Sequence, residues 1–187
     1  VIDCGLGVTR AIVESGRAVN SITHVFLTHY HSDHIIELGG LLHTAWASGL
    51  DHTVHVFGPE GLEAVWGGFC QMLSFDIVQL HTFAEGVVLQ EEGVTVQALK
   101  VLHPPVEEAY ALRFDCGSKA VTFSGDTPYF PPLAEFAKGS SILVHEAMLA
   151  EGIDFVVKAT GNTDGRLRKV RRRRCAIKPF AYKLEAL

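Results

Sequence analysis

Three imidazoles and one carboxylate crowd into residues 28–34, whose sequence is THYHSDH. Neutral imidazole and carboxylate groups are the protein ligands of zinc and similar divalent metals. The apolar segment before this run predicts a β-strand, in which alternate side chains share one side, so His29 and His31 are expected to point together. The turn that follows can bring Asp33 and His34 to a second point nearby. The spacing therefore predicts two metal ions about 3.5–4 Å apart, as in other two-metal enzymes.

Two further ligand-type residues follow strand-like segments. His103 comes after the apolar segment 94–102 and precedes two prolines, and Asp126 lies in a Gly-Asp-Thr sequence after the apolar segment 121–123. Alone, such a His is most often a surface residue and such an Asp a turn residue. Beside the His cluster, both become candidate metal ligands. Five other histidines lack ligand partners at such spacing and are interpreted as structural or surface residues: His24, His43, His52, His55 and His81.

The elements that must position these residues interleave strands with helices. Several predicted strands are consecutive, which favours layered α/β sheets over a simple alternating parallel sheet. Strands are expected at 22–28, 53–57, 77–81, 87–90, 94–102, 109–115, 120–124 and 141–145. Helices are expected at 11–16, 33–48 with an interruption at Gly39-Gly40, 60–73, 131–138 and from Glu146.

Composition and charge narrow the class of protein. With 48% hydrophobic residues in 187, the chain can build a substantial core, and no apolar stretch has the length that spans a bilayer. The four cysteines are scattered without a CxxC pair and are interpreted as reduced thiols. With no secretory signal, a cytoplasmic location is favoured.

The charge is unevenly distributed along the chain. Residues 1–165 hold seven Lys and Arg against twenty Asp and Glu, whereas residues 166–187 hold nine against one. An acidic body repels phosphate backbones, so nucleic acid is possible as a partner but not favoured. The expected organisation is a metallo-hydrolase domain at 1–165 and a basic tail at 166–187 that is disordered or non-native.

The motifs together resemble the metallo-β-lactamase superfamily of metal-dependent hydrolases. They occur in that family's order: an apolar segment ending in Asp3, the His-x-His-x-Asp-His motif, His103, and Gly-Asp-Thr around Asp126. The sequence Leu-Val-His-Glu-Ala at 143–147 is most similar to the tRNase Z and arylsulfatase-like branch. The resemblance implies an αββα four-layer sandwich with the metals at one sheet edge, incomplete here because the family's first strands precede Val1.

The resemblance also implies a role for each candidate residue. His29, His31 and His103 would bind the first metal, Asp33 and His34 the second, and Asp126 would bridge both. The ions are expected to be Zn²⁺, with Mn²⁺ or Fe²⁺ as alternatives, and a hydroxide shared between them would attack the substrate. Three residues are expected to be catalytic: Asp33, His145 as the acid that protonates the leaving group, and Glu146 as the residue that orients His145.

The chain departs from the family pattern after His145. The family supplies one more His to the second metal, but no His follows His145, so the second site is expected to be weak. The basic run that begins near Arg166 has three interpretations: out-of-frame or foreign sequence, a tail that binds polyanions or membranes, or a disordered solvated tail. Strands missing from the sheets would leave exposed edges, which predicts a homo-oligomer.

Three functions are compatible with these residues. The first is a two-metal hydrolase that acts on phosphodiester or sulfate ester bonds of a small-molecule substrate. The second is a thioester, lactone or β-lactam hydrolase, because the same hydroxide can attack carbonyl carbon. The third is a truncated metal-binding domain with weak or no activity. Maturation of tRNA is not favoured, since the stretch between Gly58 and His103 leaves little room for the long RNA-grasping arm of tRNase Z.

Overall fold

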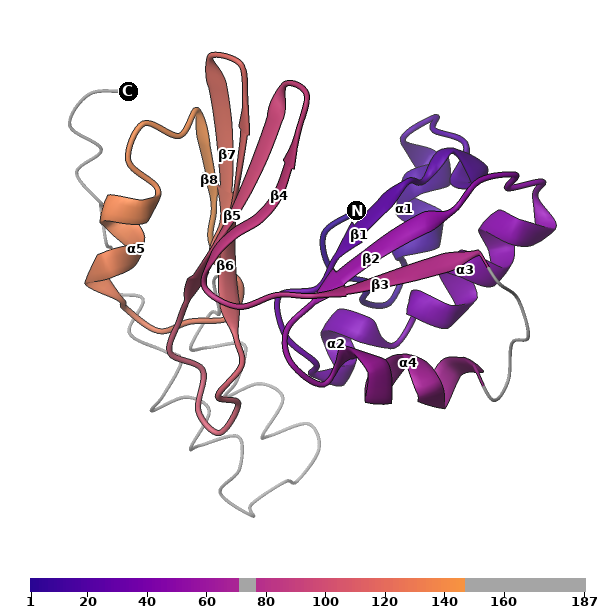
Figure 1. Cartoon of the computed structure of the whole chain (residues 1–187), viewed down its shortest axis with the longest axis horizontal. Helices are drawn as coiled ribbons and strands as arrows, with labels where there is room; N and C mark the ends of the chain where they lie inside the picture. Colours follow the sequence, from indigo (N-terminus) through magenta and orange to yellow (C-terminus); the bar gives the residue numbers. More distant parts are fainter. Residues whose placement is uncertain (71–76, 147–187) are drawn as a thin grey trace, which may run out of the picture. The chain divides into compact units, whose positions relative to one another are not determined.

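The computed structural model describes residues 1–70 and 77–146 and confirms the α/β class (Figure 1). The chain divides into two compact units, residues 1–88 and residues 89–187. Each unit has its own sheet and at least one helix, which are the components of an αββα sandwich. The domain boundary expected after residue 165, the helix expected from Glu146 and the basic tail lie outside the described residues.

The first unit contains a parallel sheet of three strands in the order β1 (His24–Phe26), β2 (Val54–Gly58) and β3 (Val78–Thr82). Ile2 adds a parallel bridge to Phe26 at the outer side of β1. Parallel strands need crossover connections, and helices provide them. α2 (Ser32–Ile35) and α3 (Leu38–Ala47) join β1 to β2, whereas α4 (Leu62–Cys70) follows β2. α1 (Val8–Glu14) precedes the sheet.

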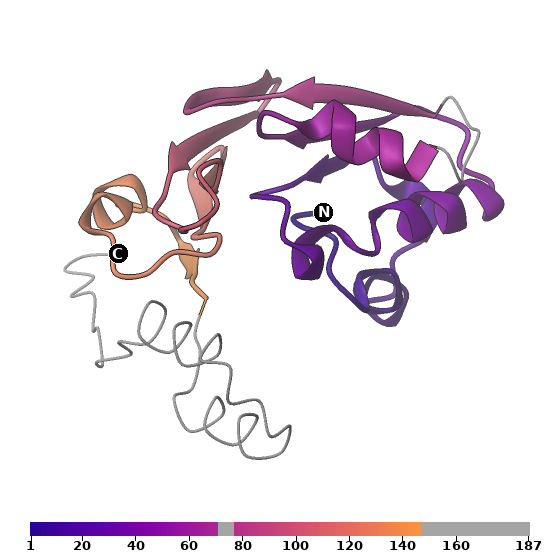
Figure 2. The same ribbon diagram turned by 90° about the horizontal axis from the view of Figure 1, so that it is seen from below.

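The core of this unit lies between the sheet and α3 (Figure 2). Along β2, Val54 and Val56 are fully buried and pack with the apolar face of α3, as the alternation of a strand requires. The alternate residues of β2, His55 and Phe57, therefore project from the opposite face of the sheet. The buried α3 side chains are Leu38, Leu41, Leu42 and Ala45.

The helix expected at 33–48 is interrupted, but not at the two glycines. Gly39 and Gly40 lie within α3, and the break falls at Ile36 and Glu37 instead. The Glu37 main-chain N–H donates to Cys4 O at 2.9 Å, and its carboxylate accepts hydrogen bonds from the main-chain N–H groups of Gly7 and Thr9. The N-terminal segment therefore sets the break, and the glycine position predicted from the sequence was wrong.

The second sheet, which belongs to the second unit except for the first residues of β4, has five strands in the order β4 (Gly86–Glu91), β5 (Val94–Lys100), β6 (Tyr110–Cys116), β7 (Lys119–Phe123) and β8 (Ile142–Val144). β5, β6 and β7 are antiparallel neighbours, and β8 is parallel to β7. Two-residue turns join β4 to β5 and β6 to β7, and the positive φ angles of Gly93 and Gly117 suit such tight turns. α5 (Pro131–Phe136) makes the crossover to β8.

α5 packs on this sheet through a small apolar cluster, and Arg113 of β6 forms hydrogen bonds at the C-terminal end of α5. Leu133 of α5 is fully buried in a cluster with Val101 and Ala111. The Arg113 guanidinium donates from Nε and Nη2 to the Asp115 carboxylate, and from Nη1 to the main-chain carbonyls of Phe136, which ends α5, and Lys138. Arg113 therefore caps carbonyls that a helix C-terminus leaves without intrahelical partners.

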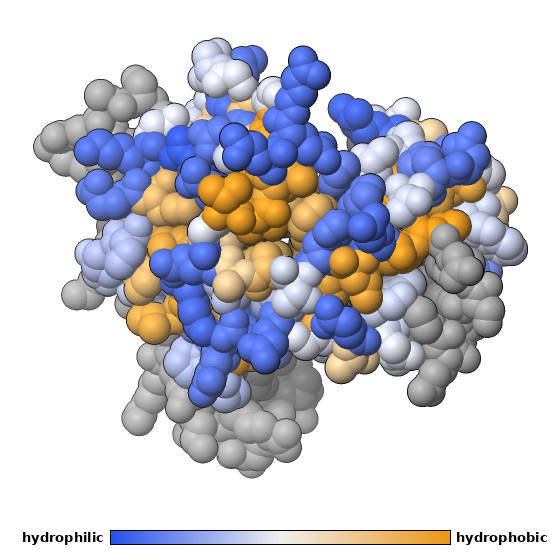
Figure 3. Space-filling model, viewed as in Figure 1, coloured by the Kyte–Doolittle hydropathy of each residue, from blue (hydrophilic) through white to orange (hydrophobic). Residues whose placement is uncertain are grey.

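Apolar side chains also reach the surface in both units, where Figure 3 shows them in orange. On β8, which ends the five-stranded sheet as described, Ile142 and Val144 are exposed. The expected homo-oligomer remains a prediction. No helix within residues 1–70 and 77–146 has the length and hydropathy to cross a bilayer. Of the four cysteines, the structure describes Cys4 and Cys116 as free thiols, as expected.

Candidate metal centre

The His29 and His31 side chains meet where the chain leaves β1. Leu27 N–H still bonds to Phe57 O, so the extended backbone continues past β1 and carries alternate side chains to one side. His29 Nε2 lies 3.1 Å from His31 Nδ1, and His29 is fully buried. His31 then occupies the N-cap position of α2 with an extended backbone. The structure thus brings together the two imidazoles that the sequence predicted to point together.

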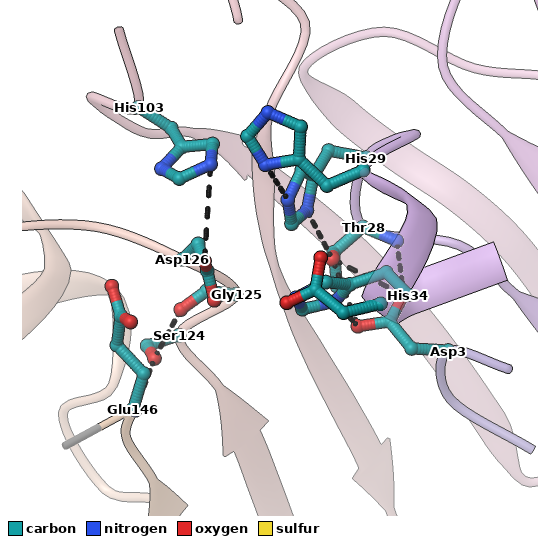
Figure 4. A network of polar contacts seen from close by, with 11 residues as sticks. Asp3, Thr28, His29, His34, His103, Ser124, Gly125, Asp126 and Glu146 are labelled. Carbon is teal, nitrogen blue, oxygen red and sulfur yellow. Dashed lines mark hydrogen bonds and ion pairs between the residues drawn. The ribbon is translucent and has the colours of Figure 1, made fainter. Parts of the chain in front are cut away.

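A chain of hydrogen bonds sets which nitrogen of His29 carries the proton and which carries the lone pair. The Thr28 hydroxyl donates its single proton to the Asp3 carboxylate, 2.9 Å from Oδ2 (Figure 4). Thr28 Oγ1 also lies 3.0 Å from His29 Nδ1, so the imidazole must be the donor in that bond. The neutral ring therefore carries its proton on Nδ1 and presents the lone pair of Nε2. A ligand histidine needs this tautomer, which a partner of its other nitrogen commonly fixes.

Asp3 also holds His34. Its Oδ2 lies 2.7 Å from His34 Nδ1, and its Oδ1 accepts the Thr28 main-chain N–H at 2.8 Å. Asp3 adopts a left-handed φ of 54°, which Asp tolerates better than most residues. The carboxylate therefore orients two imidazoles, His29 through Thr28 and His34 directly, and leaves the lone pair of each ring on Nε2. Sequence reasoning placed Asp3 in a family motif but missed this role.

Asp33 lies beside His34 but faces solvent. Its side chain is 71% exposed, and Oδ2 is 3.8 Å from His34 Nε2. The main chain at this point is closely packed, because Cys4 N–H donates to His34 O at 2.6 Å. A Cβ on Gly5 would lie 2.2 Å from the Asp33 carbonyl oxygen, so only glycine fits there. The N-terminal segment thus fixes the loop that carries both residues.

Tyr30, between the two ligand-type histidines, anchors the same loop to the turn after β2. Its hydroxyl donates to Pro59 O at 2.5 Å, and burial raises the pKa of the phenol. A Cβ on Gly58 would lie 2.6 Å from the Tyr30 hydroxyl oxygen. The absence of a side chain at Gly58 therefore lets the Tyr30 hydroxyl approach the main chain, and any larger residue at position 58 would prevent this approach.

In the second unit, three predicted site residues follow strands that end at one edge of the sheet. β5 and β7 are both antiparallel to β6, and β8 is parallel to β7, so all three run in the same direction. His103 follows β5, Asp126 follows β7 and His145 follows β8. His103 Nε2 is 3.8 Å from Asp126 Oδ2 (Figure 4), and both side chains are buried. The candidate ligands of this unit thus lie together.

His145 and Glu146 meet through the main chain. His145 Nδ1 lies 2.8 Å from the Glu146 carbonyl oxygen, which can only accept a hydrogen bond. The Glu146 N–H in turn donates to Ser124 Oγ at 3.1 Å, and Ser124 lies two residues before Asp126 in the sequence (Figure 4). The His145 proton is therefore on Nδ1, and Glu146 orients His145 through its carbonyl in this contact. The sequence predicted that Glu146 orients His145, but it did not specify that the main-chain carbonyl of Glu146 makes the contact.

Two of the histidines that the sequence analysis interprets as structural or surface residues, His55 and His81, contact each other in the structure. His55 Nδ1 lies 3.0 Å from His81 Nε2, and the His24 ring stacks on His55 with centroids 5.3 Å apart. By contrast, His52 bonds to Ile22 O at the surface, as an ordinary structural residue does. Strand alternation places His55 on the face opposite Val54 and Val56, but the pairing with His81 depends on the β2–β3 register.

The donor groups of both units suit a divalent metal. His29 and His31 in the first unit and His103 and Asp126 in the second each offer one ligand atom. Imidazole nitrogen and carboxylate oxygen are the ligands of catalytic zinc sites and of related ions. In the second unit, residues 100–107 line a hollow of about 580 Å³ that includes His103.

Comparison with known proteins identifies the family. A family model described as anti-Pycsar protein Apyc1 matches residues 1–160. Ribonuclease Z of Mycobacterium sp. (strain KMS) is 32% identical over 165 residues, which cover 79% of this chain and 58% of that protein. Ribonuclease Z of Shouchella clausii (strain KSM-K16) is 28% identical over 165 residues, 83% of this chain and 52% of that protein. The chain thus spans little more than half the length of these relatives.

Solved structures share the fold. The metallo-β-lactamase fold protein YhfI from Bacillus subtilis has a TM-score of 0.61 at 26% identity, covering 76% of this chain and 57% of YhfI. The short form of human tRNase Z has a TM-score of 0.68 at 19% identity, covering 84% and 70%. The chain therefore belongs to the anti-Pycsar protein Apyc1 family, and it is a metallo-β-lactamase superfamily member close to ribonuclease Z.

Proposed function

We propose that this chain hydrolyses phosphodiester bonds of small molecules at a divalent metal centre. The observation that carries the proposal is the hydrogen-bonded chain from His29 through Thr28 to Asp3, which presents His29 Nε2 as a metal ligand beside His31. A histidine with only a structural role would not need that tautomer. Membership of a superfamily of metal-dependent hydrolases supports the same reading.

The proposed centre joins the ligand groups of both units. His29, His31 and His103 would hold the first ion, Asp33 and His34 would hold a second one more weakly, and Asp126 would contribute to both. Zn²⁺ is the first candidate, with Mn²⁺ and Fe²⁺ as alternatives, because nitrogen and carboxylate ligands are mixed. When bound, the ions would supply Lewis-acid charge and lower the pKa of coordinated water.

The side chains around the centre then have separate tasks. Asp3 keeps His29 and His34 in the ligand tautomer, so both rings are oriented before an ion binds. Asp33, largely exposed, is free to hold a proton of the attacking water. His145 protonates the leaving group. The Nδ1–H of His145 donates a hydrogen bond to Glu146 O, so Nδ1 keeps its proton. The proton that His145 transfers is therefore the one on Nε2 of the imidazolium.

A small substrate is favoured over RNA for two reasons. The body of the chain is acidic, with twenty Asp and Glu against seven Lys and Arg in residues 1–165, which repels a long phosphate backbone. The connections between β3 and His103 are also short, with three residues between β3 and β4 and two between β4 and β5. By contrast, the hollow of about 580 Å³ beside His103 lies within the usual size range of small-molecule sites.

A substrate panel tests the proposal. The panel contains bis(4-nitrophenyl) phosphate, 4-nitrophenyl phosphate, 4-nitrophenyl sulfate, a thioester, a lactone, a chromogenic β-lactam and a precursor tRNA. The expected result is hydrolysis of the phosphodiester in preference to the others, abolished by a chelator and restored by Zn²⁺ or Mn²⁺. His31→Ala should lower the rate at least about 100-fold, whereas His43→Ala, an exposed histidine of α3, should not.

Four outcomes would overturn parts of this proposal. Activity that survives in His31→Ala would remove the metal centre from the mechanism. Preference for the sulfate or for a carbonyl substrate would reassign the reaction, and preference for the precursor tRNA would reassign the substrate class. Metal binding without turnover of any substrate would leave a metal-binding domain that is not an enzyme.

A further inference from the structure

Three histidines form a row across the three-stranded sheet, on the face opposite α3. His24 in β1 pairs in register with His55 in β2, and His81 in β3 pairs with Phe57. Because side chains two positions apart share a face, His55 and Phe57 project on the same side, where His24 and His81 meet them. The centre proposed above uses none of these residues.

The distance between two of these imidazoles suits shared coordination of one ion. His55 Nδ1 and His81 Nε2 are 3.0 Å apart. Two nitrogens that bind one ion at about 2.0–2.1 Å each, with an angle of about 90–110° between them, lie roughly 2.8–3.4 Å apart. The candidate ligands His29 and His31 show nearly the same separation, 3.1 Å.

Aromatic contacts limit the movement of both rings. His81 stacks on Phe57 with centroids 4.5 Å apart and an interplanar angle of 13°, and Phe57 stacks on Phe26 at 4.7 Å. His24 stacks on His55 at 5.3 Å. Rings held in this way lose little conformational freedom when an ion binds, which favours binding.

We propose that His55 and His81 form a second metal site, distinct from the phosphodiesterase centre, for an ion that prefers imidazole nitrogen, Cu²⁺ or Zn²⁺. Both side chains are half-buried, so water can complete the coordination. Imidazole suits these ions, and Cu²⁺ binds such ligands most strongly among the common divalent metals. Burial, together with His55 and His24 nearby, lowers the pKa of His81, so its ring is neutral at pH 7 and can bind metal.

Equilibrium dialysis of the full chain against Cu²⁺ at pH 7 tests this site. The variants are His55→Gln and His81→Gln, with His43→Gln as a matched control that removes an exposed imidazole elsewhere in the same unit. Each of the first two should bind one Cu²⁺ equivalent fewer than the wild type, and His43→Gln should bind the same number. Equal numbers in the wild type, His55→Gln and His81→Gln would overturn the proposal.

A measurement on the wild-type chain keeps the test valid if the variants misfold. Diethyl pyrocarbonate modifies accessible imidazole nitrogens, and peptide mass spectrometry reports each site. Cu²⁺ should protect His55 and His81 from modification but should not change the modification of His43. Equal modification of His55 and His81 with and without Cu²⁺ would overturn the proposal, because the two rings would then share only a hydrogen bond. Phosphodiesterase activity should persist in His81→Gln, so failure of this site and failure of the proposed function are distinguishable.

Discussion

Replacing Asp3 with Asn would show how strongly one partly buried carboxylate controls the candidate metal ligands. Asn tolerates the left-handed backbone of Asp3 and keeps an oxygen that can accept the Thr28 N–H. It loses the negative charge 2.7 Å from His34 Nδ1 and can place an amide N–H against that nitrogen instead. His34 would then carry its proton on Nε2, the atom that must bind the metal.

The size of the effect follows from the bond that is lost. A hydrogen bond to a charged group contributes about 1.5–3 kcal/mol, and a carboxylate behind a ligand histidine is worth about 10- to 100-fold in metal affinity. We therefore expect Asp3→Asn to weaken Zn²⁺ binding by about 10- to 100-fold. Competition with a chromophoric zinc chelator measures this change directly.

A matched variant is available in the same unit. Asp51 lies 3.3 Å from His52 Nδ1, but its side chain is 94% exposed, so Asp51→Asn removes an Asp–His pair that water screens. Zinc affinity should not change in Asp51→Asn. Unchanged affinity in Asp3→Asn, or an equal loss in both variants, would refute the reasoning that Asp3 controls the ligand tautomers.

Three further predictions concern the supporting structure. Tyr30→Phe removes the hydrogen bond to Pro59 O and should weaken zinc binding about fivefold. Gly58→Ala places a methyl group 2.6 Å from the Tyr30 hydroxyl and should also weaken zinc binding, but the loss should be smaller when Tyr30 is already Phe, which a chelator titration of the double variant measures. Arg113→Met removes a half-buried ion pair and two carbonyl caps, so urea unfolding should show a loss of about 2 kcal/mol; an unchanged midpoint would contradict this. Burial raises the pKa of Cys4 to about 12, so its thiol stays neutral at pH 8, and iodoacetamide with peptide mapping should label exposed Cys116 but not Cys4 in the native chain.

The strands could be predicted from the sequence because their signal is local. Alternation of apolar residues and turn glycines placed β2 and β5 to within one or two residues at most ends. The break before α3 could not be predicted in this way, because contacts of Glu37 with Cys4, Gly7 and Thr9 set it across about thirty residues of chain. Such tertiary contacts override the local preference of Gly39 and Gly40.

The site shows the same division between local and long-range information. His29 and His31 are two residues apart on an extended segment, so their proximity follows from strand geometry alone. Asp3 meets His34 only because Ile2 bridges Phe26 beside β1, and His55 meets His81 only through the register of parallel strands. The strands β2 and β3 are separated in the chain by α4, so the spacing of residues in the sequence does not show which residues of the two strands pair.

The most direct measurement of the central claim is the zinc content per chain of protein purified without added chelator, compared among the wild type, His29→Ala and His103→Ala. Each substitution should remove at least one zinc equivalent, because His29 and His103 would hold the same ion in the proposed centre. Unchanged zinc content in either variant would contradict a metal centre built from both ligand groups.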